Sequence, residues 1–167
     1  MEIVDAQVHL WSQTVVPPNG LHRKVPQFTA EECLKEMDEA GVDAALIHPP
    51  YSWDPDSNAV AVAAAKKYPQ RFAVMGQFAP DKPENRALIQ GWRKQPGMMG
   101  LRWALLTEEQ QKWLHDGTLD WVWPAAAKEG LPVAMLGGLF LDTFRSIAER
   151  HPDLRLILDH CGLNRHG

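Results

Sequence analysis

The sequence has few of the features that mark proteins outside the ordinary globular classes. It holds two cysteines in 167 residues, Cys33 and Cys161, which is too few for a disulfide framework and favours a reducing setting. No apolar run approaches the roughly 18 residues of a membrane-spanning helix, and the first residues lack the pattern of an export signal. With a net charge of −4 and no basic block, the chain offers nucleic acid no electrostatic footprint. We therefore expect a cytoplasmic protein without membrane or nucleic-acid partners.

What the sequence does contain is a regular alternation of strand and helix patterns. Thr29 and Glu32 form a capping-box pattern at a helix start, and Gly41 supplies its stop. The expected strands are 3–10, 42–47, 71–78, 98–105, 131–136 and 154–159, and the expected helices are 30–41, 58–68, 83–94, 107–115, 118–129 and 140–150. Strands that alternate with crossover helices predict a parallel α/β sheet.

Two parallel architectures fit this alternation, a doubly wound open sheet and an eight-stranded (β/α)8 barrel. The first strand is followed by a long polar segment with three prolines and no GxGxxG phosphate loop, and this favours the barrel. A complete barrel needs roughly 250 residues, so we expect residues 1–167 to be a partial barrel domain of about six strands, with the C-terminal strands missing. The favoured explanation for the missing strands is that these residues are part of a longer protein. The alternative is that two chains complete one another.

Polar side chains stand at the ends of several expected strands. Asp5, Gln7 and His9 alternate along the first strand, so they are predicted to share one face with a site at its tip. Arg102 lies in the fourth strand and His160 follows the sixth. Because barrels place their sites at strand C-termini, we expect these groups to converge at one mouth.

The segments "IVDAQVHLW", "MGLRW" and "LILDHCG", with "DPDSN" after the second strand, resemble the amidohydrolase superfamily in its amidohydrolase-related, lactonase-like branch. The resemblance runs from the first strand to the last residue and covers the N-terminal two-thirds of that fold. It implies a distorted (β/α)8 barrel with a His-x-His pair after strand one, a His after strand six and an Asp at strand eight. Carried over by position, it makes His9 and His160 catalytic and Arg102 an anion-binding residue.

Two positions depart from the metal-binding members of this family. Gln7 stands where the first His of the pair is expected, and Met135 stands where strand five carries a His. An amide oxygen is a poor zinc ligand compared with a neutral imidazole. The expectation is therefore that no metal is needed, while a divalent ion such as zinc, if bound, would use His9 and His160.

The resemblance predicts a hydrolase that opens the ring of a small carboxylated or sugar-derived lactone. Arg102 is expected to bind the substrate carboxylate, and His9, His160 and Gln7 to stabilise charge on the carbonyl oxygen. The alternatives are a zinc-dependent decarboxylase or a lactone isomerase of the same fold, or a catalytically incomplete binding subunit. A homo-oligomer or a completing C-terminal segment is a possible partner.

Several of these residues also have structural interpretations. Trp11 and His48 are predicted to line the substrate pocket, and core packing is the alternative for Trp11, as it is for Trp53 and Trp103. Arg102 could form an ion pair at the edge of the core, and Asp159 could be the polar anchor in place of His160.

Other polar groups of the sequence receive simpler assignments. Three basic residues of the first loop could attract a carboxylate or form a solvated loop: His22, Arg23 and Lys24. Cys33 is expected in the core. Cys161 next to His160 is not expected to form a dyad, because neighbouring strand residues point to opposite faces. Three residues near the start of the second helix are expected to cap it: Asp54, Asp56 and Asn58.

Overall fold

The computed structural model describes residues 1–12, 25–51, 54–136 and 140–163. The chain divides into two compact units. Unit 1 consists of residues 1–77 and 93–99, and unit 2 of residues 78–92 and 100–167. Each unit is described by itself below.

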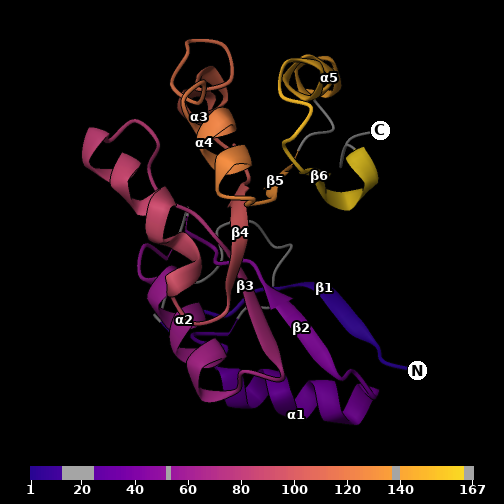
Figure 1. Cartoon of the computed structure of the whole chain (residues 1–167). Coiled ribbons are helices and arrows are strands. Elements are labelled where there is room, and N and C mark those ends of the chain that lie inside the picture. Colours follow the sequence, from indigo (N-terminus) through magenta and orange to yellow (C-terminus); the bar gives the residue numbers. More distant parts are fainter. Residues whose placement is uncertain (13–24, 52–53, 137–139, 164–167) are drawn as a thin grey trace. The chain divides into compact units, whose positions relative to one another are not determined.

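Unit 1 is a parallel sheet with two helices (Figure 1). Its elements in chain order are β1 (Val4–Val8), α1 (Ala30–Ala40), β2 (Ala44–Ile47), α2 (Ser57–Lys67) and β3 (Phe72–Gly76). The predicted caps of α1 are confirmed, since Thr29 and Glu32 make both bonds of the capping box and Gly41 ends the helix with a φ of 71°. Both strand pairs are parallel, as the alternating pattern predicts.

Strand β1 contains an irregularity that changes which of its residues share a face. Asp5 pairs with Ala45, but Val8 pairs with Ile47, so β1 contributes one residue more than β2 over this stretch. The amide of Gln7 donates to the Asp5 carboxylate at 2.9 Å, a local bond that fits a bulge here. Val8 therefore lies on the face of Asp5. The regular alternation predicted from Asp5 to His9 is wrong, because the bulge interrupts it and the strand ends at Val8.

Unit 2 contains most of strand β4 (Met98–Trp103) and the elements that follow it (Figure 1). These are α3 (Glu108–Lys112), α4 (Val122–Lys128), β5 (Val133–Met135), α5 (Leu141–Arg150), β6 (Leu156–Leu158) and the short 3₁₀ turn η2 (Asp159–Gly162). Strand β4 pairs in parallel with β5, and β5 with β6. Strands and helices thus alternate in this unit too.

Aromatic side chains form much of the core of unit 2. The ring of Phe78 contacts the rings of Trp92, Trp103 and Trp121, with centroid distances of 5.3–5.8 Å. The indole of Trp103 also donates to the Phe78 carbonyl at 2.9 Å, and that of Trp92 to the Gly100 carbonyl at 2.8 Å. The core interpretation of Trp103 is therefore confirmed.

Three expected elements differ from the structure. Residues 83–94 form a 3₁₀ helix, η1, in which the buried Ile89 and Trp92 are three residues apart, the repeat of that helix. The helix expected over 118–129 begins at Val122, after turns at Asp116–Thr118 and Gly117–Asp120. The sixth strand ends at Leu158 because the next residues enter a turn.

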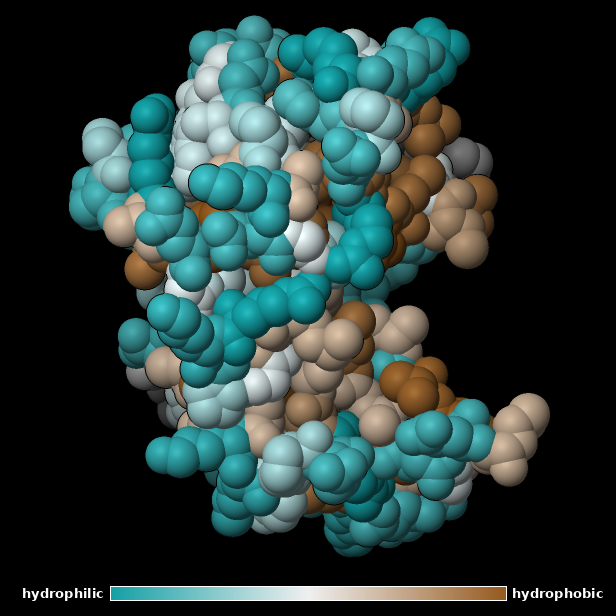
Figure 2. All heavy atoms as spheres, viewed as in Figure 1, coloured by the Kyte–Doolittle hydropathy of each residue, from teal (hydrophilic) through white to brown (hydrophobic). Residues whose placement is uncertain are grey.

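Apolar side chains are exposed along the first and the last strand. In unit 1, Ile3 and Val4 are 45% and 57% exposed, and in unit 2, Ile157 and Leu163 are 42% and 73% exposed. Figure 2 shows hydrophobic side chains among the hydrophilic ones on the face that it draws. Among the described strands, β1 pairs only with β2, and β6 only with β5. None of the helices in the described part of the chain is long and apolar enough to cross a bilayer.

Candidate functional site

His9 and His48, at the ends of β1 and β2, are joined by a hydrogen bond. The amide of the buried His48 donates to the Val8 carbonyl at 2.8 Å, which holds the two strand ends together. Nδ1 of His9 lies 2.5 Å from the His48 carbonyl oxygen. Because a carbonyl oxygen only accepts, Nδ1 carries the proton, and when the ring is neutral Nε2 carries the lone pair. The bond thereby sets the tautomer of His9.

Gln7 and Trp11 lie on either side of His9 along the chain. Gln7 is half-buried, and its backbone amide is held by Asp5. Trp11 is buried, its ring lies 5.4 Å from that of Phe28, and its indole donates to the Val25 carbonyl at 3.2 Å. The structure thus gives Trp11 the contacts of a packing residue, and its role toward a substrate stays a prediction.

Asp54 is a completely buried carboxylate in the loop that follows β2. Its Oδ1 accepts from the Asp56 amide at 3.1 Å and its Oδ2 from the Ser12 amide at 3.4 Å. Asp54 thus bonds the backbone of the residue before α2 without capping an amide of the helix, and it also holds the chain just after β1. Of the other two expected caps, Asp56 makes no side-chain cap bond, and Asn58 bonds the backbone of Gln77 instead.

The strongest electrostatic feature of unit 2 is a buried ion pair. Nε of Arg102, in β4, lies 2.7 Å from Oδ2 of Asp159, the residue after β6. The two residues are 8% and 7% exposed. Neither Nη atom of Arg102 has a hydrogen-bond partner within the described ranges. The guanidinium is therefore held through one of its five N–H groups and keeps its other donors.

His160 is exposed and lies beyond the strand that it was predicted to end. His160 and Cys161 have φ values of 52° and 55°, in the left-handed region that side-chain-bearing residues rarely adopt. The turn directs Asp159 inward and leaves His160 outside. His160 and Cys161 lie in a turn and not in a strand, so the strand alternation expected to separate their side chains does not apply, and both are exposed.

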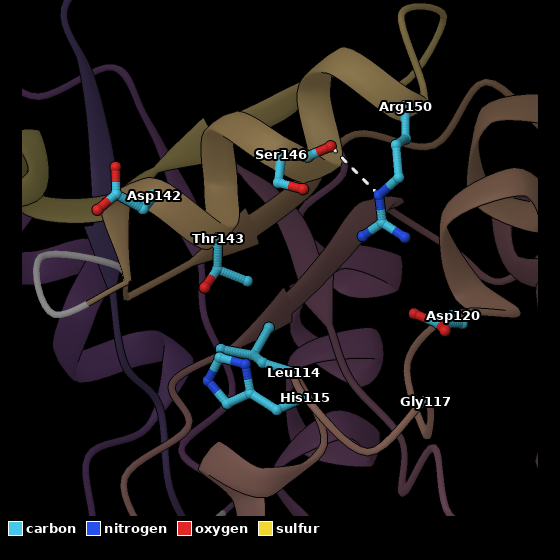
Figure 3. Close-up of a pocket in the computed structure, with 8 residues that line it drawn as sticks. All are labelled: Leu114, His115, Gly117, Asp120, Asp142, Thr143, Ser146 and Arg150. Carbon is cyan, nitrogen blue, oxygen red and sulfur yellow. Dashed lines mark hydrogen bonds between the residues drawn. The ribbon is translucent and has the colours of Figure 1, made fainter.

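A hollow of about 440 Å³ lies in unit 2 beside α5 (Figure 3). Polar side chains of α5 and of the turns before α4 surround it, and most of them are exposed: His115, Asp120, Asp142, Thr143, Ser146 and Arg150. Arg150 donates from Nε to the Ser146 carbonyl at 3.3 Å. The hollow contains none of the residues that the sequence assigns to the site.

The family model with the description Amidohydrolase, of the amidohydrolase-2 branch, matches residues 4–167. The chain belongs to the amidohydrolase family. This confirms the resemblance inferred from the motifs at the strand ends. No curated protein matches the chain.

Several solved structures share the fold of this amidohydrolase chain. They include an amidohydrolase of Burkholderia multivorans with bound zinc, at 16% identity and a TM-score of 0.78, for 97% of this chain and 58% of that one. A probable 2-pyrone-4,6-dicarboxylic acid hydrolase of Acinetobacter baumannii with bound citric acid matches at 17% identity and a TM-score of 0.67, over 97% of this chain and 59% of that one. A 5-carboxyvanillate decarboxylase of Novosphingobium aromaticivorans with manganese matches at 21% identity and a TM-score of 0.65, over 78% of this chain and 49% of that one. The fold is thus that of a partial (β/α)8 barrel, and the chain spans less than two-thirds of these structures.

The side chains of this amidohydrolase chain do not form a metal site in the described ranges. No group of three or more His, Cys, Asp or Glu residues is arranged there to hold an ion. Gln7 replaces one nitrogen ligand, and His160 faces away from the buried groups of its turn. His9 by itself has the geometry of a ligand, because a metal-binding histidine usually donates its other N–H to a carbonyl. One such residue does not make a site, so no chemical step is derived through a metal.

Four residues with predicted roles lie outside the described ranges. They are the basic cluster His22, Arg23 and Lys24, together with Trp53. Two features of the site were not predicted from the sequence, the Nδ1 bond of His9 and the second role of Asp54. Both depend on contacts between residues about 40 positions apart, and no local pattern signals them.

Proposed function

We propose that this chain forms the larger part of an amidohydrolase barrel enzyme that hydrolyses the ring ester of a small carboxylated substrate. The observation that carries the proposal is Arg102, a buried cation at the end of a strand that keeps four donors on Nη1 and Nη2. A planar guanidinium with two parallel N–H groups matches a carboxylate. The named hydrolase and decarboxylase both take carboxylated compounds, and the former was crystallised with citric acid.

The proposed reaction adds water to the lactone carbonyl and breaks the ring C–O bond, which yields a carboxylic acid and a hydroxyl group. Nε2 of His9 is the ring atom that exchanges a proton with the substrate oxygen, since Nδ1 is bound to His48. Gln7 contributes the N–H groups of its amide toward the developing negative charge. His160 supplies a second imidazole from its exposed turn. The substrate-binding roles of Trp11 and His48 rest on their places next to His9.

The edge strands support the proposal that the barrel has further strands. Ile3, Val4 and Ile157 expose apolar surface on strands that have a single described neighbour. An uncovered apolar edge favours pairing with another strand. We propose that residues 1–167 are one partial barrel domain, and that the strands completing it carry the carboxylate that takes the proton of the attacking water. A second chain is the other possible source of those strands.

Decarboxylation is the second candidate, and the manganese-bound decarboxylase structure favours it as much as the pyrone hydrolase favours hydrolysis. Both reactions need a residue that orients a carboxylate. They differ in what happens to it, since a decarboxylase releases it as carbon dioxide and a lactonase keeps it.

The experiment offers the whole protein that carries this chain two substrates, 2-pyrone-4,6-dicarboxylate and 5-carboxyvanillate, each with and without added zinc or manganese. Loss of the pyrone absorbance with one proton-releasing carboxyl formed per ring supports hydrolysis. Carbon dioxide release from the second substrate supports the decarboxylase. Turnover of neither, with no binding of either by calorimetry, contradicts the proposal.

A further inference from the structure

Strand register explains how Arg102 reaches Asp159 across an intervening strand. Arg102 is paired with Ala134 of β5, and Ala134 with Ile157 of β6. Paired residues of parallel strands point to the same face, and Asp159 follows Ile157 by two positions. Two strand spacings amount to about 9–10 Å, a span that a long arginine and a short aspartate can bridge together.

The residue between the two partners is small. Ala134 is 1% exposed and carries only a methyl group on the face that Arg102 and Ile157 share. A branched or long side chain at this position would occupy the space above the middle strand, through which the arginine extends. Ala134 is therefore the position that keeps the path from β4 to β6 open.

Asp159 binds Arg102 through Nε alone, and this bond restricts the orientation of the guanidinium plane. Nε–H lies on the side edge of the guanidinium, which it shares with one Nη, so a bond to Nε leaves the end edge, formed by both Nη atoms, pointing in a different direction from the carboxylate. The pair has no net charge, so it can remain buried before a ligand arrives. A ligand carboxylate then meets donors that are already oriented, which lowers the entropy lost on binding.

We propose that Asp159 is the positioning residue of Arg102 and that Ala134 determines the selectivity for carboxylates by leaving room for this arrangement. The inference rests on the proposed function, because it assumes that Arg102 binds a substrate carboxylate. Asp159 does not touch the substrate in this account. Its effect is transmitted through the direction of the guanidinium.

The test measures, by calorimetry, the affinity of the whole protein for benzene-1,3-dicarboxylate and for its uncharged diamide. Both ligands are planar, and neither has an ester bond that the proposed reaction could hydrolyse. The ratio of the two affinities is the readout, because general destabilisation weakens both ligands alike. The variants are Asp159→Glu, which keeps the charge and moves the carboxylate by one methylene, and Ala134→Leu, which blocks the path. Ala134→Gly is the matched control, since it disturbs the same strand position and leaves the path open.

We expect both Asp159→Glu and Ala134→Leu to lower the ratio about tenfold, the loss for a misaligned charged hydrogen bond. Ala134→Gly keeps the ratio of the unchanged protein. An unchanged ratio in Asp159→Glu overturns the positioning role. If Ala134→Leu does not fold, the result for Asp159→Glu alone decides.

Arg102→Gln separates this inference from the proposed function. If it abolishes the preference for the dicarboxylate while Asp159→Glu and Ala134→Leu keep it, only the positioning role is overturned. If Arg102→Gln also leaves the ratio unchanged, the carboxylate-binding role itself is overturned, and the inference falls with it.

Discussion

Nε of Arg102 and Oδ2 of Asp159 lie 2.7 Å apart, and both residues are more than nine-tenths buried. The pair connects β4 to the residue after β6, 57 positions away along the chain. Desolvation offsets much of the attraction within a buried pair, but a single charge left behind in the interior has no such compensation. Removing only one of the two partners is therefore expected to destabilise the folded protein more than removing both.

This asymmetry predicts a strongly non-additive mutant cycle. Arg102→Met leaves the carboxylate of Asp159 buried without its partner and is expected to lower the free energy of unfolding by about 3–5 kcal/mol. The double variant Arg102→Met/Asp159→Leu removes both charges and is expected to recover most of that loss. Denaturant unfolding of the two single variants and the double variant measures the coupling. Additive losses would show that the two side chains do not interact.

A surface cluster in unit 1 predicts a pH-dependent stability. The bonds from Lys67 at 2.6 Å and Tyr68 at 2.9 Å lower the pKa of Glu31 from 4.5 to about 2. Because the pKa of this carboxyl is lower in the folded state, its contribution is present above pH 4.5 and is lost as the pH falls toward 2.

The matched measurement compares the unfolding midpoints of the unchanged protein and Glu31→Gln between pH 2 and pH 7. The unchanged protein is expected to be more stable at pH 6, and the difference is expected to disappear near pH 2. Because Lys67 and Glu31 are exposed, added salt reduces the difference at pH 6. A difference that persists at pH 2 would assign it to another cause.

The two cysteines are predicted to differ in reactivity. Burial raises the pKa of the Cys33 thiol to about 11, whereas Cys161 is exposed in the turn after β6. Since the thiolate is the reacting form, iodoacetamide at pH 8 is expected to label Cys161 and leave Cys33 unmodified until the protein unfolds. Mass spectrometry of the labelled peptides reads the result. Equal labelling of both thiols in the native protein would contradict the buried position of Cys33.

Among Gly97, Gly41 and Gly91, replacement of Gly97 by alanine is predicted to cost the most stability. Its φ is 73°, and a Cβ added there would lie 2.4 Å from Cβ of Ala65 in α2. Gly97→Ala is therefore expected to cost about 2–4 kcal/mol, from backbone strain and overlap together.

Two other glycines separate these terms. Gly41 has a φ of 71° with open space around its Cβ position, so Gly41→Ala is expected to cost about 1 kcal/mol from strain alone. Gly91 has neither feature, and Gly91→Ala is expected to leave stability unchanged within about 1 kcal/mol or to raise it. Urea midpoints rank the three variants, and any order in which Gly97→Ala is not the most destabilised contradicts the close contact of Gly97 with α2.

The local features of this fold could be predicted from the sequence, whereas features that depend on pairing could not. The capping box at Thr29 and the stop at Gly41 depend on residues within one turn of each other, so the pattern identifies them directly. The bulge between Asp5 and Val8 exists only relative to β2. A two-residue alternation therefore does not extend through this strand to His9.

The candidate site divides in the same way. The motifs identified His9 and Arg102 as polar residues at strand ends, and the structure places both at or near the ends of their strands. The partners of these residues, the His48 carbonyl and the Asp159 carboxylate, come from distant strands. The exposed position of His160 follows from a left-handed turn that no periodicity predicts, because two residues with side chains adopt it in succession.

The central claim is that Arg102 binds a carboxylate, and the most direct measurement is a calorimetric titration of the whole protein with 2-pyrone-4,6-dicarboxylate, repeated on Arg102→Gln. Loss of a charge-assisted hydrogen bond is expected to weaken binding about 10- to 150-fold in the variant. Circular dichroism melting of the variant confirms that the titration is made on folded protein. Equal affinity in the two proteins would contradict the claim.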